Sequence, residues 1–138
     1  MPLSRQRRFP RARRSVPAAR TFALETLAQW GYRDRQDDVR LCVSELATNA
    51  LLHGVPPGRE FSLVLVGDGP LVRIEVRDSG GGSPQVSEAE ADDFGGRGLP
   101  LVMALADDFG VTPHHPGKTV WTVLKMDPAE VKDGDGSS

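Results

Sequence analysis

Three residues in the middle of the chain are spaced so that one helix presents them together. Glu45, Asn49 and His53 lie four positions apart, which on a helix places their side chains on one face, about a turn apart. The intervening residues are mostly apolar, and a carboxylate beside an amide is costly there unless something polar binds. Because Mg²⁺ takes oxygen ligands and keeps several waters, the pair predicts Asn49 as a Mg²⁺ ligand and Glu45 as a proton acceptor.

The same residues also have a purely structural interpretation. Glu45 and Asn49 suit the solvated face of an amphipathic helix, and His53 in a last helical turn interacts favourably with the helix dipole and the free carbonyl groups. Spacing alone leaves both interpretations open.

The first glycine-rich segment follows a strand-like run and reads Asp78-Ser-Gly80-Gly-Gly82. An aspartate at the end of a buried strand can accept a hydrogen bond from an exocyclic amine such as that of adenine. The glycines after it let the backbone approach a flat ring, because no Cβ stands in the way. An ordinary Asp-Ser-Gly turn is the structural alternative.

The second glycine-rich segment, Gly96-Arg97-Gly98-Leu99, feeds a predicted helix. Free N–H groups and the positive end of a helix dipole form a binding site for phosphate, and Arg97 adds donors for phosphate oxygens. Further along, Thr119 could offer a hydroxyl group toward the same phosphates. A hinge before a helix and a plain strand threonine are the structural alternatives.

The apolar pattern predicts three helices and four strands that position these residues. Ser15 is the predicted cap of the first helix, and the turn 67–70 predicts an antiparallel hairpin. The expected helices are 15–30, 34–53 and 99–109, and the expected strands are 3–9, 61–66, 71–76 and 119–126.

Length and composition predict one cytoplasmic domain. The 138 residues suffice for a single core, which we place in residues 1–126, with a basic segment at 1–14 and a polar tail at 127–138. The single cysteine, Cys42, excludes an internal disulfide framework and fits a reducing compartment. No apolar run approaches the ~20 residues that span a bilayer, and the net charge of -2 does not favour nucleic acid.

The motifs, taken in order, resemble the GHKL superfamily of ATPases. The Glu45–His53 run is similar to its N box, Asp78–Gly82 to its first glycine box, 96–99 to its second, and 117–119 to its last. The resemblance covers roughly residues 15–126. It implies an α+β fold, a two-layer sandwich whose mostly antiparallel mixed sheet is covered on one face by about three helices, and it implies ATP and Mg²⁺ as ligands.

Within that superfamily the chain is most similar to the stand-alone anti-sigma-factor serine kinases of bacteria. Two helices precede the first glycine box, and the run Ser44–Ala50 fits that group. The resemblance implies that Glu45 is the catalytic base, that Asn49 holds Mg²⁺ and that Asp78 contacts adenine. It also implies a homodimer that sequesters a sigma factor or phosphorylates a serine of a small STAS-type antagonist protein.

Three other functions compete with this one. The loop 83–93 is acidic and contains no basic residue, so Arg97 is the one cation of this region that could hold the phosphates. This favours a nucleotide-gated binding module with little catalysis. A histidine-kinase catalytic domain would need an upstream phosphoacceptor helix, which residues 1–14 do not supply. The six arginines of that segment could instead contact nucleic acid, although a solvated edge strand explains them more simply.

Overall fold

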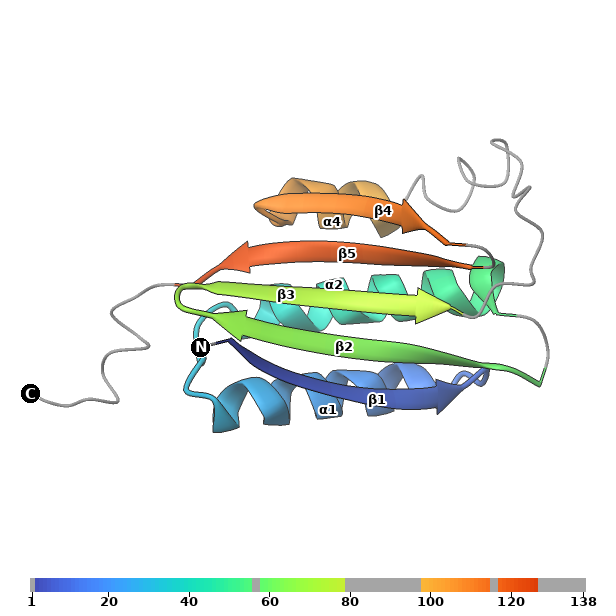
Figure 1. Cartoon of the computed structure of the whole chain (residues 1–138), viewed down its shortest axis with the longest axis horizontal. Coiled ribbons are helices and arrows are strands. Elements are labelled where there is room, and N and C mark those ends of the chain that lie inside the picture. The colour runs from blue at the N-terminus through green and yellow to red at the C-terminus, as the bar shows by residue number, and fades with distance from the viewer. Residues whose placement is uncertain (1, 56–57, 79–97, 115–116, 127–138) are drawn as a thin grey trace, which may run out of the picture.

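The computed structural model describes residues 2–55, 58–78, 98–114 and 117–126 as one layer of strands packed on one layer of helices (Figure 1). In chain order the elements are β1 (Leu3–Pro10), α1 (Ser15–Gln29), α2 (Gln36–Asn49), the π-helix η1 (Ala50–Gly54), β2 (Glu60–Asp68), β3 (Leu71–Asp78), α4 (Gly98–Leu105), β4 (Asp108–Pro113) and β5 (Lys118–Lys125).

The five strands form one sheet in the order β1-β2-β3-β5-β4. Every pairing between them is antiparallel, and in Figure 1 the helices all lie behind this sheet. The predicted α+β two-layer sandwich is therefore confirmed. The sheet is antiparallel at each described pairing rather than mixed.

The core lies between the sheet and the helices. Leu65 of β2 and Ile74 of β3 are register partners and both are fully buried, as strand alternation requires for one face of a sheet. The other face carries the polar residues of β3. There Arg73 lies 4.3 Å from the ring centroid of Trp121 and forms an ion pair with Glu75.

Two predicted helix boundaries need correction, the start of the first helix and the end of the second. Ser15 is the first residue of α1 and not its cap, since Arg14 occupies the cap position; the Ser15 hydroxyl instead donates to the Pro10 carbonyl at 2.6 Å. The second helix is regular only to Asn49. Beyond it the chain widens into η1, closed by a hydrogen bond of 2.9 Å from Val55 N to Ala50 O.

The region predicted as a single helix over 99–109 divides into α4 and the edge strand β4. The helix ends at Leu105, and the chain then pairs with β5 from Asp108 onward. Gly110 lies under the indole of Trp121, where a Cβ would overlap the ring atoms. Pairing with a strand later in the chain therefore overrides the local helical pattern.

No helix within the described ranges is long and apolar enough to cross a membrane.

Candidate functional site

Most of the predicted site residues that the structure describes gather at one end of the sandwich, which we call the site end. Here α2 runs into η1, β3 ends at Asp78, and α4 begins at Gly98 (Figure 1). The helix α2 packs against α4 and β3, and η1 packs against β3. The topology therefore brings together motifs that are far apart in the sequence.

Glu45 and Asn49 lie one turn apart on the regular part of α2, as predicted. Glu45 is half-buried, while Asn49 is only 8% exposed. No hydrogen bond joins the Asn49 side-chain amide to any other group in the described ranges. The Asn49 amide is not among the fully buried polar atoms that lack a partner in these ranges, so its atoms reach solvent and are accessible to a ligand.

His53 lies beyond the regular part of α2, in η1. Glu45 and Asn49 share a face of regular α-helix as predicted, and the same face for His53 stays a prediction. Single π-turns within helices are frequent at functional sites.

Asp78 is the buried last residue of β3, as predicted, and it contacts a residue that the sequence did not identify. Lys118, its register partner on β5, donates to one Asp78 carboxylate oxygen from its backbone N at 3.2 Å and to the other from Nζ at 3.0 Å. In the sequence this lysine is only the middle residue of a Gly-Lys-Thr run, with no assigned role. Its ion pair depends on the β3–β5 register, which local sequence does not specify.

Thr119 lies apart from these residues. It is the register partner of Arg77, and strand alternation places its side chain on the face of the sheet away from the helices. There its Oγ1 lies 2.7 Å from Nε2 of His114. The structure thus does not bring the Thr119 hydroxyl to the face where Asp78 lies.

The glycine-rich segments are only partly within the described ranges. Gly98 and Leu99 form the first turn of α4, where free backbone N–H groups can bind an anion. The remaining predicted contacts, Gly80, Gly82, Gly96 and Arg97, lie outside the described residues.

The donor set of the site end suits Mg²⁺ held together with phosphates. The described ranges contain no group of three or more His, Cys, Asp or Glu residues that could hold a metal by itself. Mg²⁺ bound to a phosphate ester needs only one or two protein oxygens, because waters and phosphate oxygens complete its shell. The buried Asn49 amide can supply one such oxygen.

Cys42 takes no part in this chemistry. It is fully buried on the core side of α2, and this burial raises the pKa of its thiol to about 11. A thiol with such a pKa is almost wholly protonated near neutral pH and is a poor nucleophile.

Comparison with known proteins identifies the family. Residues 9–124 match the family described as the histidine kinase-like ATPase domain. The chain belongs to this family. The match runs from the end of β1 into β5, so this ATPase domain includes every element of the site end. No curated protein matches the chain.

Family membership implies ATP binding for this histidine kinase-like ATPase domain. The site end carries three kinds of group that suit ATP and Mg²⁺. These are the N-terminus of α4, which suits phosphates, the amide oxygen of Asn49, which suits Mg²⁺, and the carboxylate of Asp78, which suits an amine. The sequence identified each of these groups, and the fold brings them to one end of the molecule.

Proposed function

We propose that this ATPase domain is an anti-sigma-factor serine kinase. It binds ATP with Mg²⁺ at the site end, sequesters a sigma factor, and transfers the γ-phosphoryl group to a serine of a small STAS-type antagonist protein. The observation that supports this most strongly is the buried Asn49 amide without a partner in the described ranges, one helical turn after Glu45.

Two residues of α2 have separate roles in the proposed phosphoryl transfer. Asn49 would hold the Mg²⁺ ion, whose charge offsets that of the phosphates. Glu45 accepts the proton of the serine hydroxyl as its oxygen attacks the γ-phosphorus. The bond from that phosphorus to the β–γ bridging oxygen breaks, and ADP leaves. The half-buried position of Glu45 suits a base that must reach a partner protein.

Asp78 can bind the adenine amine without releasing Lys118. A carboxylate offers about four lone-pair positions, and Lys118 occupies one on each oxygen. The remaining positions suffice for an exocyclic amine. In this arrangement the two hydrogen bonds from Lys118 hold the Asp78 carboxylate in place.

Calorimetric titration with ATP and Mg²⁺ tests the nucleotide site. We expect Asp78→Asn to lose adenine recognition, and Asn49→Ala to lose the tightening that Mg²⁺ gives the wild type. Glu25→Gln, at an exposed position of α1, is the control and should bind as the wild type does. Equal affinities for all four proteins would contradict the proposed site.

Transfer of radiolabelled phosphate from ATP to antagonist-type proteins tests the kinase. Glu45→Gln should lower transfer by about 100-fold or more, which is typical for loss of a general base, while ATP affinity stays near the wild-type value. If ATP changes partner affinity but Glu45→Gln changes neither transfer nor partner binding, the domain is a nucleotide-gated binding module instead.

A further inference from the structure

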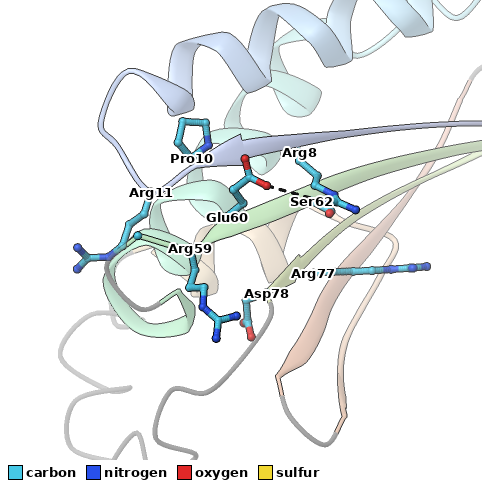
Figure 2. Close-up of a pocket in the computed structure, with 9 residues that line it drawn as sticks. Arg8, Pro10, Arg11, Arg59, Glu60, Ser62, Arg77 and Asp78 are labelled. Atoms are coloured by element: carbon cyan, nitrogen blue, oxygen red, sulfur yellow. Dashed lines mark ion pairs between the residues drawn. The ribbon is translucent and has the colours of Figure 1, made fainter.

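A hollow opens at the site end, and Asp78 is part of its lining. It has a volume of about 540 Å³ and lies at the edge of the sheet where β1 ends and β2 begins (Figure 2). Among the described residues its charged lining consists of four arginines and two carboxylates, and we call the hollow the arginine groove: Arg8, Arg11, Arg59, Arg77, Glu60 and Asp78.

The arginine groove is positively charged in a protein whose net charge is -2. Asp78 is already neutralised by Lys118. The other carboxylate, Glu60, lies 3.9 Å from Arg8, and both side chains are at least half exposed, so this pair contributes little. The excess of guanidinium groups therefore favours an anionic occupant.

Two of the arginines are held in place by the protein itself. Arg11 donates from Nε to the Leu51 carbonyl at 3.1 Å, and Arg77 donates to a Glu75 carboxylate oxygen at 3.0 Å. Holding donors in position before binding reduces the entropy lost on association. These bonds leave further guanidinium N–H groups of both residues available.

Arg59 differs from the other three arginines. Neither an ion pair nor a hydrogen bond engages its guanidinium among the described residues, and Figure 2 shows this group turned toward Asp78. Because its removal breaks no ion pair or side-chain hydrogen bond in that part of the chain, Arg59 is the residue whose substitution probes the groove most cleanly.

The character of the groove favours an acidic peptide over nucleic acid. None of the lining residues that the structure describes is aromatic, whereas single-stranded nucleic acids are bound by rings on which bases stack, and Glu60 opposes a continuous phosphate backbone. Beside the groove, β1 is an edge strand of the sheet. Its outer backbone groups pair with no other described strand and can hydrogen-bond an extended peptide.

We propose that the arginine groove binds an extended acidic segment of a partner protein. The guanidinium group of Arg59 would take one of its carboxylates through two parallel N–H donors. Arg77, whose Nε and Nη2 donate to Glu75, would offer its remaining N–H groups. This binding surface needs no nucleotide, and it therefore goes beyond the proposed kinase function.

Fluorescence anisotropy without nucleotide tests this proposal with a labelled oligoglutamate peptide. We expect wild-type binding that weakens as salt is added, and Arg59→Gln and Arg77→Gln each weakening it by about 5-fold or more. Arg33→Gln is the matched control: it removes the same charge at an exposed position next to Tyr32, which packs at the opposite end of the sheet.

Three outcomes would overturn the proposal. The first is equal peptide affinity for Arg59→Gln, Arg33→Gln and the wild type. The second is tighter, Arg59-dependent binding of labelled oligodeoxythymidine of matched charge, which would assign the groove to nucleic acid. The third is complete competition by low concentrations of inorganic phosphate, which would reduce it to a small-anion site.

Discussion

The two ends of the sandwich satisfy their polar groups in opposite ways. At the end opposite the site, which we call the hairpin end, the turn between β2 and β3 is bonded to the rest of the fold. The Tyr32 hydroxyl donates to the Gly69 carbonyl at 2.7 Å, and Met126 N donates to the Pro70 carbonyl at 2.6 Å. At the site end, the Asn49 amide has no such partner in the described ranges.

Arg35 does most to close the hairpin end. It donates four hydrogen bonds, to carboxylates of Asp38 and Asp107 and to backbone carbonyls of Leu105 and Lys125. These bonds join the start of α2 to the end of α4 and the end of β5. Arg35 has φ 56°, a left-handed conformation that costs a non-glycine residue about 1–2 kcal/mol. The four bonds offset that cost.

Stability and binding are therefore supplied by different ends of one small domain. The hairpin end uses its polar side chains to hold the elements together. The site end keeps polar side chains available for ligands, which lowers the stability that the same positions could supply. Substitutions at the two ends should therefore separate unfolding free energy from ligand affinity.

Replacing Arg35 should give the largest change in unfolding free energy. Arg35→Ala removes all four bonds and leaves partly buried carboxylate and carbonyl acceptors unsatisfied, so we expect a loss of about 3 kcal/mol in unfolding free energy. Urea denaturation measures it. Arg33→Ala, an exposed neighbour, should leave the midpoint unchanged, and similar midpoints for both variants would show that the hairpin end is not the stabilised one.

Replacing Asn49 should affect stability and binding in opposite directions. Asn49→Leu puts an apolar group of similar size in a buried position, so unfolding free energy should stay level or rise by up to about 1 kcal/mol, while Mg²⁺-dependent ATP binding is lost. Gln36→Leu, an exposed amide on the same helix, should retain ATP binding. A strongly destabilised Asn49→Leu would mean that the amide serves the fold.

Asp107 should give the smallest effect, visible only in acid. Hydrogen bonds from Lys125 N and then from Arg35 lower the pKa of its carboxyl group. This stabilisation is present above the unfolded pKa of about 3.9 and is lost as the pH falls through the lower folded value. Since the side chain is 48% exposed, solvent screening keeps the contribution below about 1 kcal/mol.

Thermal unfolding between about pH 6 and pH 3 tests this contribution. Asp107→Asn should flatten the acid loss of stability relative to the wild type. Asp37→Asn, which removes a carboxylate that is 96% exposed, should follow the wild-type curve. If Asp107→Asn and Asp37→Asn give the same curve, the carboxylate of Asp107 adds nothing to the Arg35 contacts.

Much of the secondary structure and one pair of site residues could be predicted from local sequence patterns. The half-buried pattern of residues 71–76 predicts β3, and a Gly-Asp-Gly-Pro turn predicts its hairpin with β2. Four-residue spacing pairs Glu45 with Asn49 on one helix, because a regular α-helix fixes which side chains share a face. The change to a π-helix at Ala50 is not predicted by this spacing.

Local sequence specifies which chemical groups this protein carries and most of the elements that present them. Which of these groups meet depends on the fold: Asp78 meets Lys118, Arg35 meets Asp107 and Leu105, and four arginines from separate segments surround one groove. The fold also turns 108–113 into a strand. These contacts join residues far apart in the chain, and they follow from sheet register and packing, which a local pattern does not contain.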